Sequence, residues 1–347
     1  MGRRDAQRRI RRITPGFPVL VLALVAGGSA CEWWGRRAAR REHPPRGTLV
    51  DIGGRPLQLD RRGTGSPTVV LESGLDSFGA LSWGLVHDSL AATTRTCAYS
   101  RAGVVWSDPR GDALTGSGVA ADLHAALQAV GEQAPFVMVG HSLGGPLILT
   151  YTGRYPGQVA GLVMVDASHP DQLERLAPFM PGGAMPSMTP LKVASALSWT
   201  GLVRLATRGA EGQKAQPEGD RRAVNACTAT SLGAALRELD ALARVLDEAR
   251  QFQSLGDRPL VVLTAMKPAT ADERAAMGVS EEQAVGMKQA WHALHVEQAA
   301  WSARSRHQLV EDASHDIRFD RPDVVIAAVR GVVGVVRGSA AVAGAGR

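Results

Sequence analysis

A serine in a glycine-rich turn is the residue of this sequence best placed for covalent chemistry. Residues Gly140–Gly144 read Gly-His-Ser-Leu-Gly and directly follow Phe136–Val139, a short apolar run typical of a buried parallel strand. A serine hydroxyl reaches a substrate carbonyl only if it projects into a cleft, and a sharp strand-to-helix turn holds it there. The glycines two residues before and after Ser142 remove side chains that would clash in such a turn. The pattern predicts Ser142 as a nucleophile.

A serine hydroxyl is a weak nucleophile at neutral pH and needs a neighbouring base. His315 is the best candidate, because it lies in the loop after the last predicted strand, and such loops collect the site of an open α/β sheet. His169 is a weaker candidate base. His141 is next to the serine, where we expect it to support the turn. His292 and His295 fall on a predicted helix, where we expect packing or surface roles.

The base needs an acid to orient it, and the sequence offers two places for one. Asp166 directly follows the predicted strand Gly161–Val165, which puts its carboxylate at the same edge of the sheet as Ser142. The alternative place follows the next strand, but no carboxylate appears there until Asp272 and Glu273. The missing carboxylate at that strand end favours Asp166. Asp272 and Glu273 stay open as alternative acids, and so does a purely structural role for Asp166.

Acyl transfer also needs donors for the oxyanion that develops on the carbonyl oxygen. The backbone N–H of Leu143, the residue after the serine, is the first expected donor. The second should come from the loop after the short strand Thr68–Leu71, where Gly74 lets the backbone approach the substrate closely. We expect the N–H of Leu75 to fill this role.

The elements that position these residues alternate between strands and helices, which predicts a mostly parallel sheet with helices on both faces, an α/β fold. Thr48–Ile52 and Pro56–Leu59 read as a hairpin that turns at Gly53-Gly54, and the later elements are helices at 117–130, 145–155 and 322–336 and strands near 91–99, 159–165, 260–263 and 306–310. Residues 169–256 interrupt the alternation and read as an inserted helical cap. The predicted division is a leader and linker (1–46), an α/β core (47–168 and 257–337), the cap, and a flexible tail (338–347).

The leader accounts for the basic character of the chain. Residues 1–46 hold 11 basic and 3 acidic residues, whereas the rest holds 28 basic and 30 acidic residues, a net charge of −2. This distribution argues against nucleic-acid binding. Six arginines precede an uncharged stretch, Ile13–Cys31, as in a secretory signal. Cleavage after small residues, lipidation at Cys31 and retention as a membrane anchor all stay open. We expect an exported or membrane-anchored protein.

The three cysteines, Cys31, Cys97 and Cys227, fit no metal-ligand spacing and no dense disulfide framework. In an exported protein Cys97 and Cys227 could pair. Otherwise we expect both to be buried thiols that pack as small hydrophobes. We expect no metal and no cofactor.

Taken together, these motifs resemble the α/β-hydrolase superfamily, in the branch with an inserted cap that includes many bacterial esterases. The resemblance runs from about Thr48 to Val336 and rests on Ser73-Gly74-Leu75, Tyr99-Ser100-Arg101-Ala102-Gly103, Gly140-His141-Ser142-Leu143-Gly144-Gly145, Val165-Asp166-Ala167-Ser168-His169-Pro170 and Ser314-His315. Two positions depart from the family pattern, which often has His-Gly in place of Ser73-Gly74 and Asp-Arg in place of Ser100-Arg101. Serine at the turn argues against relatives that use an aspartate nucleophile.

The resemblance and the residues together predict a serine hydrolase that cleaves an ester or related acyl substrate through an acyl-enzyme. Acyl transfer to another acceptor, cofactor-free peroxidase-like chemistry and a non-catalytic binding module are the alternatives. Apolar residues of the cap favour a hydrophobic substrate group, although they could equally pack the cap on the core; they are Met180, Met185, Met188, Leu191, Trp199, Leu202 and Val203. The sequence gives no indication of oligomeric state.

Overall fold

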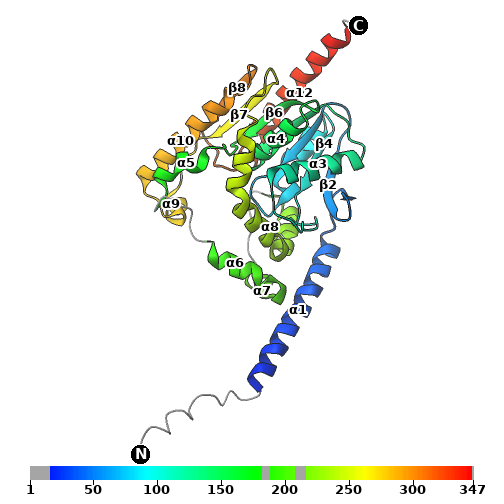
Figure 1. Ribbon diagram of the computed structural model, residues 1–347, viewed down its shortest axis with the longest axis vertical. Helices are drawn as coiled ribbons and strands as arrows, with labels where there is room; N and C mark the ends of the chain where they lie inside the picture. Colours follow the sequence, from blue (N-terminus) through cyan, green and yellow to red (C-terminus); the bar gives the residue numbers. More distant parts are fainter. Residues whose placement is uncertain (1–15, 182–187, 208–215, 346–347) are drawn as a thin grey trace, which may run out of the picture.

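An eight-stranded, mostly parallel sheet forms the centre of the molecule. The computed structural model describes residues 16–181, 188–207 and 216–345 (Figure 1). The strands are β1 (Thr48–Asp51), β2 (Pro56–Arg62), β3 (Thr68–Glu72), β4 (Thr96–Ser100), β5 (Phe136–His141), β6 (Val159–Val165), β7 (Leu260–Ala265) and β8 (Ser305–Val310). Their order is β1-β2-β4-β3-β5-β6-β7-β8, and β2 is antiparallel to both of its neighbours. The predicted fold class and the amino-terminal hairpin are confirmed.

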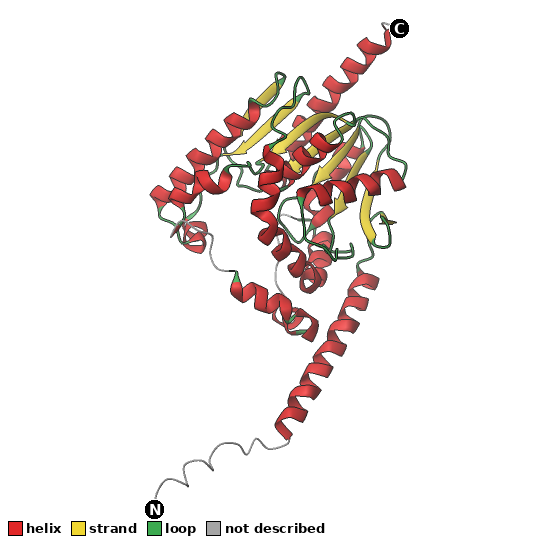
Figure 2. Ribbon diagram, in the orientation of Figure 1, coloured by secondary structure: helices red, strands yellow, loops and turns green. Residues whose placement is uncertain are grey.

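Helices cover both faces of this sheet (Figure 2). The longer helices of the chain are α1 (Gly16–Glu42), which extends away from the sheet (Figure 1), α3 (Gly116–Ala129), α4 (Gly144–Arg154), α8 (Glu218–Arg250), α10 (Glu281–Ala299) and α12 (Pro322–Ala345). The shorter ones are α2 (His87–Ala91), α5 (Gln172–Leu176), α6 (Thr189–Ala196), α7 (Leu202–Ala206), α9 (Ala271–Met277) and α11 (Ile317–Asp320), with short 3-10 turns η2 (Gly79–Trp83), η3 (Ala177–Phe179) and η5 (Ser198–Thr200).

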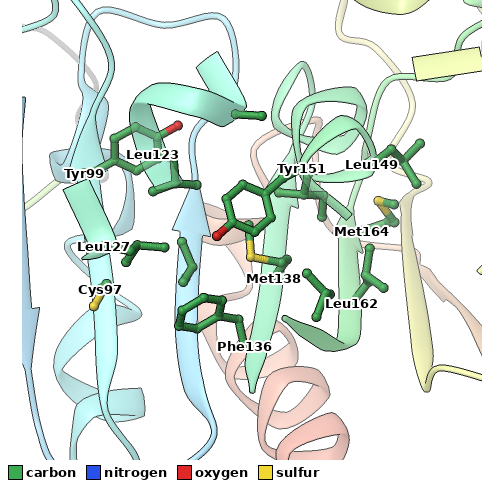
Figure 3. Close-up of a cluster of buried hydrophobic side chains, with 14 of the residues drawn as sticks. Cys97, Tyr99, Leu123, Leu127, Phe136, Met138, Leu149, Tyr151, Leu162 and Met164 are labelled. Carbon is green, nitrogen blue, oxygen red and sulfur yellow. The ribbon is translucent and has the colours of Figure 1, made fainter. Parts of the chain in front are cut away.

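Alternation along the central strands builds one core on each face. Phe136 and Met138 of β5 join a buried cluster with residues of α3 and α4 (Figure 3). Val137 and Val139 of the same strand join the opposite cluster, which includes residues of α12. Side chains two residues apart share a face of a strand, so an apolar run that is buried on both sides fills both cores at once.

The segment between β6 and β7 folds into helices α5 to α8, and α8 packs against α3 and α4. Three of the six described apolar side chains that suggested a substrate-facing cap are exposed, namely Leu191 (46%), Trp199 (51%) and Leu202 (56%), whereas Met180 and Met188 are half-buried and Val203 is buried. Met185 lies outside the described residues.

Helix α12 is longer than the sequence suggested. We expected a helix to about Val336 and a flexible tail from residue 338, but the helix continues to Ala345. Alanine has the highest helix propensity, and no proline interrupts this segment. Among the described helices, α12 also contains a stretch, Pro322–Ala341, with the length and hydropathy of a membrane span. Val325 and Val329 of this stretch are fully buried in the core of the sheet, which accounts for its apolar composition.

Candidate active site

Ser142 lies at the tip of a sharp turn between β5 and α4, as its flanking glycines predicted. Its φ angle is +50°, a conformation that non-glycine residues rarely adopt. A Cβ atom at Gly140 would lie 2.6 Å from the Gly144 carbonyl oxygen, and one at Gly144 would lie 2.5 Å from the Glu72 carbonyl oxygen. Only glycine fits at these two positions.

The structure brings together three of the predicted site residues. His315 Nε2 lies 2.9 Å from Ser142 Oγ, and His315 Nδ1 lies 2.6 Å from Asp166 Oδ2. The other oxygen of Asp166, Oδ1, accepts a hydrogen bond from the Ala265 N–H at 2.8 Å. Asp166 has a φ of +42°, and its side chain is buried, whereas the His315 side chain is half exposed. The imidazole thus connects a buried carboxylate to an accessible hydroxyl.

The electrostatics of this group keep Asp166 ionised. Burial alone would raise the pKa of Asp166, but the hydrogen bond and charge of His315, the charge of His295 and the Ala265 N–H together outweigh it. The pKa of Asp166 therefore lies below its ordinary value. A carboxylate in this state accepts a hydrogen bond from the Nδ1–H of the imidazole and leaves Nε2 free to accept a proton from the serine.

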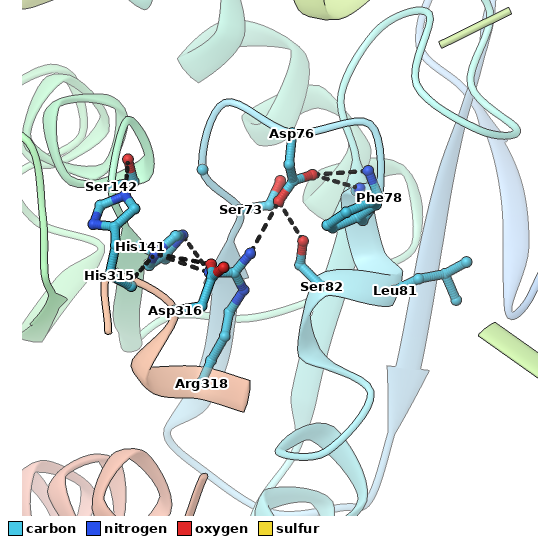
Figure 4. Close-up of polar contacts among 12 residues, drawn as sticks. Ser73, Asp76, Phe78, Leu81, Ser82, His141, Ser142, His315, Asp316 and Arg318 are labelled. Atoms are coloured by element: carbon cyan, nitrogen blue, oxygen red, sulfur yellow. Dashed lines mark hydrogen bonds and ion pairs between the residues drawn. The ribbon is translucent and has the colours of Figure 1, made fainter. Parts of the chain in front are cut away.

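His141 supports the loop of His315 rather than only its own turn. Its Nε2 lies 2.9 Å from the backbone oxygen of His315, and Arg318 Nη1 lies 2.8 Å from both ring nitrogens (Figure 4). Burial, the charge of Arg318 and the charge of His315 hold the pKa of His141 well below its ordinary value, so the ring is neutral and can donate from Nε2. Arg318 also pairs with Asp316 at 2.7 Å and Asp76 at 3.4 Å.

Of the two residues expected to bind an oxyanion through their amides, Leu75 lines the cleft at Ser142 and Leu143 directly follows the serine. This cleft has a volume of about 490 Å³ and is lined by Gly74, Leu75, Ser142 and His315, among others. Among the described residues, neither the Leu75 N–H nor the Leu143 N–H donates to another protein group. A Cβ atom at Gly74 would lie 2.7 Å from His141 Nδ1 and 3.0 Å from Ser142 Cβ, so the loop approaches the serine as closely as a glycine allows.

A buried arginine fixes this loop from behind. Arg101 donates to the backbone oxygens of Ser73 and Gly74, pairs with Glu72 at 2.6 Å, and pairs with Glu238 of α8 at 2.7 Å. Burial raises the pKa of both carboxyls, and the charge of Arg101 acts against this shift. Because α8 belongs to the segment inserted between β6 and β7, Arg101 ties the insertion to the loop that carries Leu75.

His295, which we expected to pack or to lie at the surface, is a fully buried member of the site. Its Nε2 lies 2.9 Å from the Ala167 carbonyl oxygen, and its Nδ1 lies 2.7 Å from Thr264 Oγ1, which in turn lies 2.7 Å from His307 Nε2. If His307 and His295 both carry their proton on Nε2, each group donates to the next. His307 then donates to the Thr264 hydroxyl, the hydroxyl donates to His295 Nδ1, and His295 Nε2 donates to the Ala167 carbonyl oxygen. Burial lowers the pKa of His295 to about 4, so the ring is neutral near pH 7.

The lowered pKa of His295 predicts acid sensitivity of the fold. The unfolded chain binds a proton here below about pH 6.5, whereas the folded protein does so only near pH 4. Stability should therefore fall as the pH drops through this window, by up to about 3 kcal/mol for this one histidine. Urea unfolding at pH 7.5 and pH 5 measures the effect. We expect His295→Asn to weaken this pH dependence and His43→Gln to preserve it; an unchanged slope in His295→Asn contradicts the assignment.

The other candidates lie away from Ser142 Oγ. His169 is buried, and its ring nitrogens lie within 4 Å of Asp171 and Glu297. Within the described part of the chain, this trio has metal-ligand spacing, but Arg250 pairs with Asp171 at 2.7 Å and Arg175 pairs with Glu297 at 2.9 Å. The positive charges of the two arginines balance the negative charges of the two carboxylates without a metal ion.

The alternative acids and the cysteines have other surroundings. Asp272 and Glu273 lie in the first turn of α9, where Glu273 caps the helix by accepting from the Thr270 N–H. Cys97 and Cys227 are buried free thiols in separate clusters, as the packing interpretation predicted, and they are not paired.

Comparison with known proteins agrees with the fold described above. A profile of the alpha/beta hydrolase fold matches residues 67–188. A hydrolytic enzyme from Pseudomonas aeruginosa PAO1, whose function is described as probable, is 21% identical with a TM-score of 0.59, covering 80% of this chain and 90% of its own. A thermophilic esterase from Thermogutta terrifontis is 18% identical with a TM-score of 0.52, covering 81% and 94%. At these identities the likeness concerns the fold.

The curated relatives match over a shorter region. "Probable transporter efuK" of Hormonema carpetanum is 34% identical over 128 residues, which is 35% of this chain and 18% of that protein. The matched part covers 18 to 39% of the length of the curated relatives.

Proposed function

Since the chain belongs to the α/β-hydrolase superfamily, we propose that it is a serine hydrolase that cleaves a carboxylic ester through an acyl-enzyme. The observation that carries the proposal is the continuous hydrogen-bonded path from Asp166 through His315 to Ser142, with distances of 2.6 and 2.9 Å. The two ends of this path lie where activation of a nucleophile needs them, because the carboxylate is buried and the hydroxyl faces a cleft.

In the proposed reaction, His315 Nε2 removes the proton of Ser142 as Oγ attacks the ester carbonyl carbon. The carbonyl oxygen becomes an oxyanion, which accepts hydrogen bonds from the Leu75 and Leu143 N–H groups. Collapse of this intermediate breaks the ester bond, and the imidazolium gives its proton to the departing alcohol. Water then attacks the acyl-enzyme with His315 as base, and its breakdown restores the Ser142 hydroxyl.

Labelling with a fluorophosphonate probe tests this proposal. The probe forms a covalent bond only with an activated serine, so we expect the wild type to be labelled and Ser142→Ala to remain unlabelled. Ser339→Ala removes an exposed serine of α12 and serves as the matched control, which should label like the wild type. An unlabelled wild type, or labelling that survives in Ser142→Ala, contradicts the proposed nucleophile.

We also propose that the protein is exported and stays attached to the membrane through α1. This helix exposes Leu20, Leu22, Leu24, Trp33 and Trp34, and arginines follow the two tryptophans. A helix whose first half is apolar and whose second half carries tryptophan and arginine suits a bilayer and its interface. Its middle is also packed against the insertion, because Glu32 is 2% exposed and pairs with Arg204 of α7 at 2.8 Å. This contact favours retention of α1 over its removal.

Fractionation of cells that express the full chain with a carboxy-terminal tag tests the attachment. We expect the protein in the membrane fraction after a carbonate wash, with an intact α1 by mass spectrometry. Leu22→Glu combined with Leu24→Glu should release it, whereas Val296→Glu, on the exposed side of α10, should not. A soluble wild type whose sequence starts beyond α1 contradicts retention and leaves the proposed reaction untouched.

A further inference from the structure

A second cleft opens on the other side of His315 and has no role in the reaction described above. Its volume is about 560 Å³, and it shares His315 and Asp316 with the cleft at Ser142. Residues of helices α9 and α10 line much of it. The apolar part of the lining includes Met277 of α9, Ala284, Met287 and Trp291 of α10, and Leu176 of α5. The methionines and alanines of these two helices, rather than those of the predicted cap, form the apolar surface next to the site.

Two lysines interrupt this apolar lining, and lysine is rare in the chain. Only four of its 39 basic residues are lysines, and two of the four, Lys267 and Lys288, line this one cleft. Lys288 Nζ donates to the Ala265 carbonyl oxygen at 3.0 Å, which leaves two of its three N–H groups for other acceptors. The cleft therefore offers ammonium donors at the end of an apolar surface.

Each acidic group of the cleft is held by a protein group other than the two lysines. Asp166 is held by His315 at 2.6 Å, and Asp316 is held by Arg318 at 2.7 Å. Glu273 is the remaining carboxylate, and it accepts the Thr270 N–H at 2.7 Å as a helix cap. That hydrogen bond, with smaller contributions from the charges of Lys267 and Lys288, lowers the pKa of Glu273. Among the described residues no carboxylate forms an ion pair with Lys267 or Lys288, so both ammonium groups are available to an anionic ligand.

The indole of Trp291 adds an unsatisfied donor. Its ring lies 6.2 Å from that of His315, and its Nε1 is buried with no hydrogen-bond partner among the described residues. A buried N–H without a partner costs free energy, which an acceptor atom of a ligand would recover.

We propose that this second cleft binds the part of the ester that carries an apolar chain with an anionic end group, such as a half-ester of a dicarboxylic acid. The apolar lining from α9 and α10 takes the chain, and Lys267 and Lys288 bind the anionic end. This inference rests on the proposed function and specifies its substrate class. Apolar pockets commonly obtain their specificity from a few polar groups placed in this way.

Hydrolysis of matched p-nitrophenyl esters by the full-length protein tests the proposal. The anionic probe is the mono-p-nitrophenyl ester of adipic acid, and the neutral probe is its methyl ester. We expect the wild type to favour the anionic probe, and Lys288→Met and Lys267→Met each to lower kcat/KM for that probe by about tenfold. The two methionine variants should lose less on the neutral probe than on the anionic probe, and Lys288→Arg should keep most of the preference.

Lys192→Met is the matched control, because Lys192 lies on α6 and pairs with Asp240 outside the cleft. It should behave like the wild type towards both probes. Equal rates for the two probes in the wild type, or an equal loss on both probes in the lysine variants, overturn the inference and leave the proposed function standing. If the wild type hydrolyses neither probe and resists the fluorophosphonate, the proposed function itself fails.

Discussion

Replacing Ser142 with alanine is expected to lower kcat for ester hydrolysis by about 10⁴- to 10⁶-fold, while KM changes little. The loss is large because alanine lacks the oxygen atom that forms the covalent bond to the substrate, and His315 then has no hydroxyl to activate. The amides of Leu75 and Leu143 and the walls of the cleft are left in place. They should sustain a slow residual hydrolysis, since donors aimed at the oxyanion still stabilise attack by water.

Steady-state kinetics on a short p-nitrophenyl ester measure this prediction, with thermal unfolding as a check on the fold. Alanine suits the buried side of the turn as well as serine does, so we expect a similar melting temperature. Activity above about 1% of the wild type in a folded Ser142→Ala protein contradicts the role of this residue, because a nucleophile cannot be lost at so small a cost.

The meeting of Ser142, Asp166 and His315 could be predicted because each follows a strand of one parallel sheet. The carboxyl ends of β5, β6 and β8 share one edge, so residues that follow these strands converge there whatever the distance between them in sequence. The requirement for glycine on both sides of Ser142 could also be predicted, because its cause is local. A Cβ atom at either Gly140 or Gly144 would contact backbone oxygens of the same turn or of its neighbour.

The supporting residues could not be predicted in this way, because their partners come from elements whose packing is not encoded locally. Arg101 and Glu238 are 137 positions apart and meet only because α8 packs against α3 and α4. His295 read as an ordinary helical residue, yet α10 buries it against Ala167. The apolar residues of the insertion were visible in the sequence, but no local pattern shows that α9 and α10 form the cleft beside His315 instead.

Replacing Asp166 with asparagine is expected to lower kcat by about 10⁴-fold with KM nearly unchanged. The cause lies in the two hydrogen bonds of this carboxylate. Oδ1 accepts the Ala265 N–H, so the asparagine oxygen should take that place, and its NH₂ group should face His315 Nδ1. The imidazole then accepts at Nδ1 and carries its proton on Nε2, towards Ser142. In this tautomer it cannot remove the proton of the serine.

Asp272→Asn is the matched control for this tautomer effect, because Asp272 lies exposed in the first turn of α9. It should retain the activity of the wild type. The fluorophosphonate provides a second readout, since we expect Asp166→Asn to react slowly at pH 7 while its fold, followed by circular dichroism, is preserved. Full activity in Asp166→Asn contradicts the assigned acid, and a large loss in Asp272→Asn instead favours the carboxylate after β7. Either result leaves the contact between His315 and Ser142 as the remaining support for the proposed nucleophile, because that hydrogen bond does not depend on which carboxylate orients the ring.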